Sequence, residues 1–107
     1  MTTFDRREEG FENKFAHDEE LKFKAEARRN KLLGLWVAQR LGLSGEAAND
    51  YAKTVVAAGI SAGGEAAVIG KTVGDLTAKS ADVSEPQIRA KMSELMAQAI
   101  AQVQAGV

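Results

Sequence analysis

One stretch of the chain could bind phosphate, because it ends in the Gly-Lys-Thr tripeptide that closes a P-loop. The stretch runs from Gly64 to Thr72. A P-loop needs four residues between its two glycines and a buried strand before it, since its backbone amides must wrap the phosphates at a fixed geometry. Here five residues separate Gly64 from Gly70, and no strand pattern precedes them. We therefore interpret the stretch as part of a glycine-interrupted helix.

The other residues capable of catalytic or metal chemistry are isolated. His17 is the single histidine, and the chain has no cysteine, so zinc would lack the convergent nitrogen and sulfur ligands it needs. No carboxylate pairs with a histidine or a second carboxylate in an apolar setting, which argues against acid–base or nucleophilic catalysis. We predict that the protein is not an enzyme and has no metal site and no required cofactor.

His17 itself has two interpretations. The first is an ordinary exposed histidine in a loop. The second follows from its position at the junction between the charged first segment and the rest of the chain. Because histidine changes its charge near neutral pH, His17 is also a candidate for tuning partner binding by pH.

A cluster of basic side chains could be taken for a nucleic-acid patch. Its members are Lys22, Lys24, Arg28, Arg29 and Lys31. Acidic residues are interleaved with them, and residues 1–31 carry eight basic and eight acidic side chains. Phosphate binding normally needs an uncompensated positive field, whereas the formal net charge of the chain is −1. We expect a solvated helix face and no nucleic-acid partner.

A line of aromatic residues runs through the charged first segment. Phe4, Phe11 and Phe15 fall within about 40° of one another on a helix, and charged residues occupy the other faces. Such a helix has one narrow apolar edge, which suits a groove on another protein. Gly10 and like-charge pairs four residues apart weaken it in isolation. We expect residues 1–18 to be disordered when free and helical when bound. The alternative is a fifth short helix folded back on its own domain.

The remainder has the length and composition of one small helical domain. The chain has 107 residues and is 45% hydrophobic, and its apolar residues recur at intervals of three and four, as helices require. We predict an all-α fold, with an arm over residues 1–18 and a four-helix bundle over 19–107. No secretory signal or membrane-length apolar stretch is visible. We therefore expect a cytoplasmic protein without membrane insertion.

The first two predicted helices are bounded by glycines. One runs from about 19 to 41 and is capped by Gly42, and its second half is the expected buried spine, with Trp36 as a large core side chain. The next runs from about 45 to 58. We expect Gly59 to end it and to open a flexible connection over 59–64.

The last two predicted helices differ in how strongly the sequence marks them. Gly70 and Gly74 interrupt the apolar pattern of the third helix, at about 65–79, so its continuity is left open. The fourth, at about 85–104, begins with Ser84, which is followed three residues later by a glutamine, the pattern of a capping box. These helices and their short connections predict a small bundle.

The first 43 residues resemble the zeta subunit, the ATPase-inhibitor family of alphaproteobacterial ATP synthases. The resemblance rests on Thr3-Phe4-Asp5, on the stretch KFAHDEEL at 14–21, and above all on ARRNKLLGLW at 27–36. Beyond residue 43 it consists of the helical pattern and a matching Tyr51-Ala52 pair.

The resemblance implies a protein inhibitor of ATP hydrolysis. In the family, the arm inserts between a catalytic and a non-catalytic subunit of the F-type ATP synthase head, becomes helical there and blocks the rotary cycle. The implied partner is the catalytic head, at the cytoplasmic face of the inner membrane. The implied partner-binding residues are three apolar contacts and three ion-pairing groups: Phe4, Phe11 and Phe15, and Arg6, Arg7 and Lys14.

A second function also follows from the resemblance. Some relatives bind adenine nucleotide on the bundle, so the alternative is a nucleotide-binding helical bundle with a sensory or regulatory role. Weak binding of ATP or ADP is then expected, at a site that the sequence does not assign.

Overall fold

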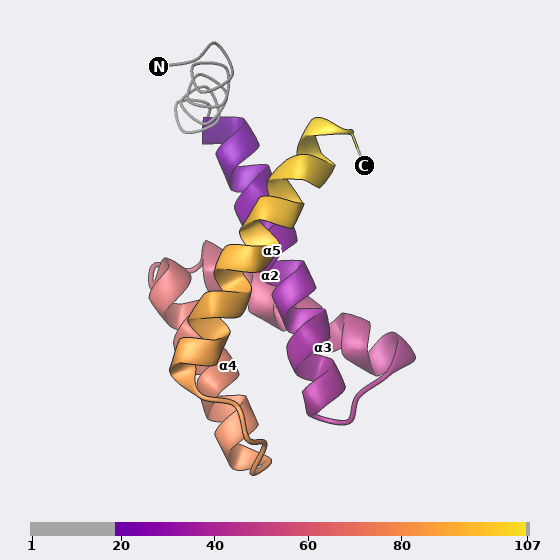
Figure 1. The fold of residues 1–107 in the computed structure, drawn as a ribbon, viewed down its shortest axis with the longest axis vertical. Coiled ribbons are helices and arrows are strands. Elements are labelled where there is room, and N and C mark those ends of the chain that lie inside the picture. The colour runs from indigo at the N-terminus through magenta and orange to yellow at the C-terminus, as the bar shows by residue number, and fades with distance from the viewer. Residues whose placement is uncertain (1–18, 107) are drawn as a thin grey trace, which may run out of the picture.

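The computed structural model describes residues 19–106, which form four helices joined by short connections (Figure 1). The helices are α2 (Glu19–Arg40), α3 (Gly45–Ile60), α4 (Gly64–Ala78) and α5 (Glu85–Gln104). No strand occurs in this part of the chain. The prediction of an all-α four-helix bundle is therefore confirmed.

Helix α2 is the element that all the others share, since α3, α4 and α5 each contact it. In Figure 1 its N-terminal half lies beside the C-terminal half of α5, and its C-terminal half runs toward the connection to α3. The core forms where the four helices meet. It is built from aliphatic side chains and one methionine: Leu33, Val37, Val55, Val68, Ile69, Leu76, Ile88, Met92 and Leu95.

The end of α2 follows a local sequence signal. Gly42 adopts a φ of +81°, a left-handed conformation that glycine reaches without steric cost. Its N–H donates to the Gln39 carbonyl at 3.2 Å, and the Leu43 N–H donates to the Ala38 carbonyl at 2.9 Å. These two bonds form a Schellman motif and confirm Gly42 as the C-cap.

The start of α5 is also marked locally. The Ser84 N–H donates to Oε1 of Gln87 at 2.7 Å, which is one half of the predicted capping box. Pro86 stands in the first turn, where its missing N–H costs no helical hydrogen bond. The predicted boundaries of this helix, 85–104, agree with the structure.

Helix α3 does not end at Gly59 as predicted, but continues to Ile60. A Cβ atom at position 59 would collide with the side-chain amide of Asn30, which is buried on α2. Gly59 therefore permits a close approach of α3 to α2 rather than ending the helix. The connection to α4 is only residues 61–63.

Helix α4 is continuous through both of its internal glycines. A Cβ at Gly70 or Gly74 would meet no atom within 4 Å, so both lie on the open face. The opposite face buries Val68, Thr72 and Leu76, and this packing holds the helix despite the low propensity of glycine. The P-loop-like stretch thus lies within a helix, as interpreted from its spacing.

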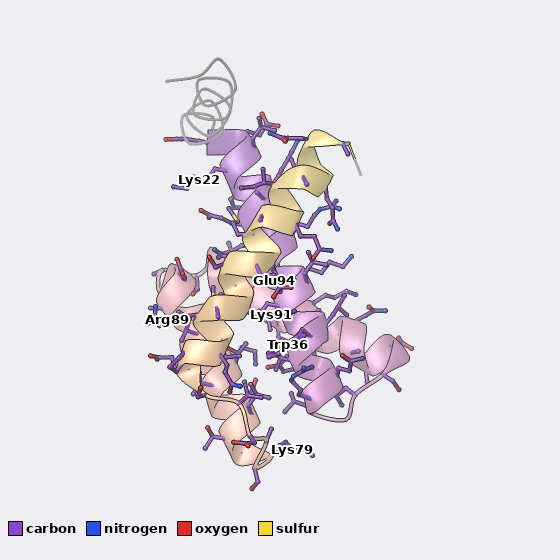
Figure 2. All side chains as sticks on the ribbon, viewed as in Figure 1. Lys22, Trp36, Lys79, Arg89, Lys91 and Glu94 are labelled. Atoms are coloured by element: carbon purple, nitrogen blue, oxygen red, sulfur yellow. The ribbon has the colours of Figure 1, made fainter. Side chains whose placement is uncertain are left out.

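Trp36 is not the core residue that the sequence predicts. It is partly exposed, with the Arg40 guanidinium 3.8 Å from the centre of its ring and Lys91 Nζ at 5.6 Å (Figure 2). The buried side of this half of α2 instead carries Leu33 and Val37 together with the small residues Gly34 and Ala38. Small residues let α3 come close, so this side faces the core and Trp36 is left at its edge.

The close contact at Gly34 can be tested against a matched glycine. A Cβ at position 34 would lie 2.6 Å from Ala52 Cα, so we expect Gly34→Ala to destabilise the fold by about 1–3 kcal/mol through overpacking. Gly70→Ala is the control, because its Cβ enters open space and should stabilise α4 by about 1 kcal/mol. Thermal unfolding should move in opposite directions. A stabilised Gly34→Ala variant would contradict the close crossing.

Candidate functional site

The predicted arm lies outside the residues that the structure describes. This covers all six predicted partner-binding residues and His17: Phe4, Arg6, Arg7, Phe11, Lys14, Phe15 and His17. Their assigned roles stay predictions. The structure does describe the surface of the bundle that adjoins the start of α2 at Glu19, which directly follows the predicted arm in the chain.

A groove of about 670 Å³ lies beside the first turns of α2. We call it the α2–α5 groove, because α2 and α5 form most of its walls. Its apolar lining includes Leu21, Leu35, Val56 and Val103. Phe23 stands at the same groove, with 56% of its surface exposed. Its other lining residues are Lys24, Ala27, Arg28, Lys31, Leu32, Gln102 and Gly106.

The charged residues that line the α2–α5 groove are all basic. Lys24 forms an ion pair of 3.3 Å with Glu20, which does not line the groove. Arg28 donates to Oε1 of Gln102 at 3.2 Å. Lys31 is exposed and makes no hydrogen bond or ion pair within residues 19–106. The groove therefore combines an apolar floor with positive charge.

The predicted solvated face on α2 is partly correct. Lys22, Lys24 and Lys31 are exposed, but Arg28 and Arg29 are partly buried. Each of the two arginines donates to the oxygen of a neutral side-chain amide, Arg28 to Gln102 and Arg29 to Asn30. The Arg28 bond joins α2 to α5, whereas the Arg29 bond is local to α2.

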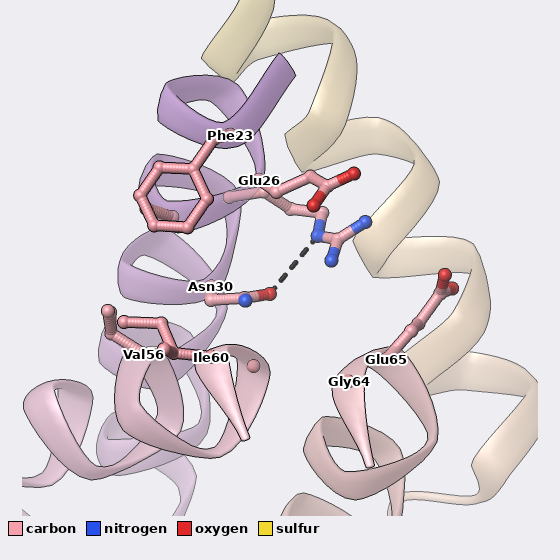
Figure 3. A pocket seen from close by; sticks show the side chains of 10 residues that line it. Phe23, Glu26, Asn30, Val56, Ile60, Gly64 and Glu65 are labelled. Carbon is pink, nitrogen blue, oxygen red and sulfur yellow. Dashed lines mark hydrogen bonds between the residues drawn. The ribbon is translucent and has the colours of Figure 1, made fainter. Parts of the chain in front are cut away.

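A second hollow, of about 280 Å³, lies among α2, α3 and α4 (Figure 3). Arg29 Nε donates to Oδ1 of Asn30 at 3.1 Å on its wall. The N-terminus of α4 carries no side-chain cap. The Gly64 N–H donates to the Ser61 carbonyl at 3.0 Å, so only the amides that follow it in the first turn can face an anion. Glu26 and Glu65 also line this hollow, and their negative charges would repel an anion bound there.

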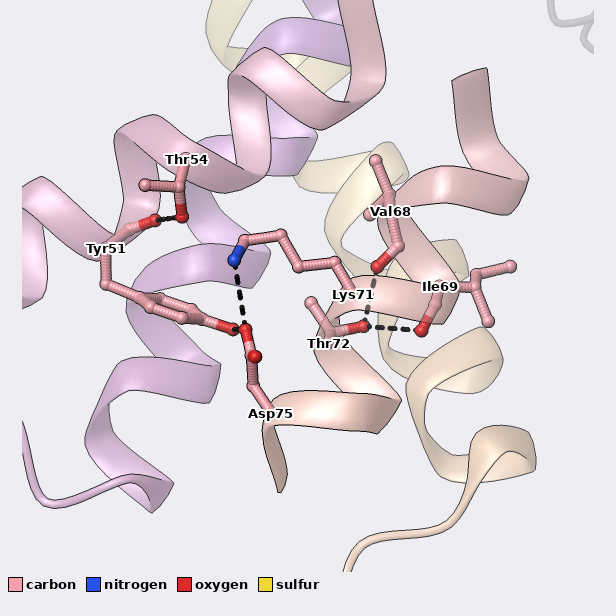
Figure 4. A network of polar contacts seen from close by, with 7 residues as sticks. All are labelled: Tyr51, Thr54, Val68, Ile69, Lys71, Thr72 and Asp75. Carbon is pink, nitrogen blue, oxygen red and sulfur yellow. Dashed lines mark hydrogen bonds and ion pairs between the residues drawn. The ribbon is translucent and has the colours of Figure 1, made fainter. Parts of the chain in front are cut away.

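A polar network joins α3 to α4 (Figure 4). The Tyr51 hydroxyl donates to Oδ2 of Asp75 at 2.8 Å, and Lys71 donates to the same oxygen at 3.1 Å. Burial, followed by this hydrogen bond and the negative charge of Asp75, raises the pKa of Tyr51 well above its usual value. A phenol held neutral in this way is a structural donor and not an activated base.

Two further functions find no support within residues 19–106. These residues hold no cluster of three or more histidine, cysteine or acidic side chains that could bind a metal ion. None of the four helices has the length and hydrophobicity to cross a membrane.

These observations define the class of the molecule: a small helical bundle whose surface grooves suit binding. The family model of ATPase inhibitor subunit zeta matches residues 1–102, and the chain belongs to this family. The match confirms the resemblance found in the first 43 residues and extends it over the bundle. Membership places the chain among ATPase inhibitors, a regulatory class of protein.

A solved structure supports the same fold. It is a solution NMR structure of a protein 49% identical in sequence, with a TM-score of 0.70, and the match covers 81% of this chain and 99% of that one. No curated protein matches.

The sequence prediction included neither of these two hollows. Each is assembled from residues far apart in the chain, such as Arg28 and Gln102. The one local signal was Phe23, a large apolar residue between two lysines. Phe23 lies outside both the predicted arm and the predicted core, so the sequence pattern assigns it no role.

The raised pKa of Tyr51 predicts an alkaline loss of stability. The folded-state pKa of Tyr51 exceeds the unfolded value of about 10. The contribution of the neutral Tyr51 phenol to the free energy of unfolding is therefore complete below about pH 10 and declines as the pH rises further. Tyr51→Phe should lose about 1 kcal/mol at neutral pH and show a shallower decline above pH 10. Urea unfolding at several pH values measures both. Equal alkaline slopes would exclude a role for Tyr51.

Proposed function

We propose that residues 1–18 form an inhibitory arm that enters a cleft between a catalytic and a non-catalytic subunit of the F-type ATP synthase head and blocks ATP hydrolysis. The observation that carries this proposal is the family match, which begins at residue 1 and so includes the arm as well as the bundle. The protein would then act at the cytoplasmic face of the inner membrane, through its association with the synthase.

The composition of the arm suits this role. Phe4, Phe11 and Phe15 would fill apolar positions in the cleft, and Arg6, Arg7 and Lys14 would pair with carboxylates of the head. Ordering such a segment costs about 2–5 kcal/mol of the gross interaction energy. Gly10 adds to this cost, and any helix already present before binding should raise the affinity.

The bundle would set how far the arm enters. Gly34 and Gly59 bring α3 against α2, so α2 is firmly attached to the remaining helices. A helical arm of eighteen residues continuing the axis of α2 would reach about 27 Å beyond it. The four-helix body is much wider than one helix, and it would stop against the outside of the head.

Removal of the arm provides the direct test. Deletion of residues 1–18 should abolish inhibition of ATP hydrolysis by the purified head and leave the bundle folded, because the buried core residues given by the structure lie between 25 and 99. Steady-state hydrolysis and circular dichroism measure the two effects. If the truncated chain inhibits as strongly as the full chain, residues 1–18 are not the inhibitory segment.

Aromatic variants refine this test. Phe11→Ala with Phe15→Ala should weaken inhibition at little cost in melting temperature. Ile60→Ala is the control, because Ile60 is 62% exposed and its replacement removes exposed apolar surface from the bundle. A large drop in melting temperature for the phenylalanine variants would instead indicate a fifth helix packed on the bundle.

Adenine nucleotide binding is the second candidate function. The observation that favours it is the hollow among α2, α3 and α4, which combines an aromatic ring for stacking, Phe23, with Arg29 and the uncapped N-terminus of α4. Its volume of about 280 Å³ is just below the usual range for small-molecule sites, which begins at about 300 Å³. Its two carboxylates, Glu26 and Glu65, oppose a phosphate, so binding would be weak.

Nucleotide titration separates this candidate from a nonspecific effect. ATP and ADP added to labelled protein should give saturable amide shifts around Gly59 and Gly64, and Arg29→Gln should reduce them. Lys79→Gln is the control, since Lys79 lies on the turn at the far end of α4. Shifts that do not saturate, or that persist in the Arg29 variant, would rule the hollow out.

A further inference from the structure

We propose that the α2–α5 groove is a second contact with the synthase head, and that it receives an amphipathic helix whose apolar ridge is flanked by carboxylates. The proposal rests on the proposed function for the identity of the partner. It adds a recognition surface on the bundle, separate from the arm.

The shape and lining of the groove fit a helix. Its floor is aliphatic, with Leu21, Leu35 and Val103 among its lining residues, and its volume is about 670 Å³. Phe23 is exposed beside it and offers a large apolar side chain to a partner. Apolar anchors at intervals of three and four residues are what such a groove accepts from an amphipathic helix.

The charge of the groove selects the partner. Lys24, Arg28 and Lys31 line it, and no acidic residue does so within the described chain. Arg28 has a neutral partner, Gln102, and keeps its full charge. Lys31 has no partner within residues 19–106. Carboxylates on the incoming helix would complement these cations, whereas a basic helix would be repelled.

The position of the groove links it to the arm. Leu21, at the groove, follows the arm by three residues, so a surface that holds the arm also lies next to the groove. Once the arm is inserted, contact at the groove is effectively intramolecular. A second copy of the chain is a poorer occupant, because a two-fold contact would set the same three cations against one another.

The arm of the same chain is the other competing occupant. It carries acidic residues, but it leads directly into α2 at Glu19. To occupy the groove, the chain would have to fold back along α2 between Phe15 and Leu21, and an arm held there could not at the same time enter the cleft of the head. A helix of the head needs no such reversal.

Charge reversal in the full-length chain tests the groove. Lys31→Glu should weaken binding to the purified head about tenfold at low salt, measured as a Kd, because it places a carboxylate against carboxylates. Lys22→Glu is the matched control: the same change on the same helix, at an exposed residue that does not line the groove. It should change the Kd less than twofold. Equal effects of the two variants would overturn the proposal.

A second variant guards against a folding artefact. Phe23→Ser removes the exposed aromatic and should also weaken binding, while circular dichroism shows an unchanged helix content. If both the Lys31→Glu and the Phe23→Ser variants keep full affinity for the head, the α2–α5 groove is not a binding surface for it.

Cross-linking identifies the occupant. Because the chain has no cysteine, Lys31→Cys introduces a unique site for a photoreactive label. We expect a cross-link to a segment of a head subunit with carboxylates beside an apolar stripe. Cross-links to residues 1–18, to a second copy of the chain, or to a basic segment would each overturn the proposal.

The readouts separate this inference from the proposed function. If Lys31→Glu weakens binding to the head and the unmodified chain does not inhibit hydrolysis, the groove is a contact with the head but the inhibitory function is wrong. If the chain inhibits hydrolysis and the Lys31→Glu variant binds the head as tightly as the unmodified chain, the inhibitory function is supported and the groove is not a contact with the head.

Discussion

The close crossing of α2 and α3 is the contact on which the rest of the fold depends. At Gly34 the two backbones come so near that a single added carbon would lie 2.6 Å from Ala52 Cα. A second close approach occurs where Gly59 meets the buried side chain of Asn30. Between them these contacts fix α2 along α3 at two levels. With that pair fixed, α4 and α5 can close over the aliphatic core, and Trp36, on a different side of α2, stays at the edge.

Features of the fold that depend on local chemistry were predictable. Gly42 and Ser84 act through backbone groups only a few residues away, so the boundaries they set can be recognised from neighbouring residues. Features that depend on tertiary contacts were not. Gly59 has the appearance of a helix end, but its role is set by Asn30, twenty-nine positions earlier. Trp36 satisfies an apolar periodicity, yet the side that becomes buried carries Leu33 and Val37 beside the small residues that admit α3.

The same division applies to the candidate sites. The arm could be proposed from sequence because the spacing of its phenylalanines is local and because the resemblance lies in the same residues. The α2–α5 groove could not, since its walls join α2 to residues such as Gln102, which is 74 positions from Arg28. The decapeptide that carries the resemblance now has a structural explanation. Arg28 contacts α5, Asn30 approaches Gly59, and Gly34 admits α3.

The start of α2 connects the arm, the groove and the bundle energetically. From residue 25 onward the helix buries side chains in the core, beginning with Ala25, whereas the six residues before it are exposed or only partly covered. This first turn and a half has little packing of its own, so its helical state depends on the favourable placement of Glu19 and Glu20 at the positive end of the helix and on its attachment to the buried part. A partner that holds either the arm or the groove would stabilise the same stretch. Because both binding events would require that stretch to be helical, each would lower the ordering cost of the other. Cooperation between the two surfaces then needs no change in the bundle, only the shared helix that joins them.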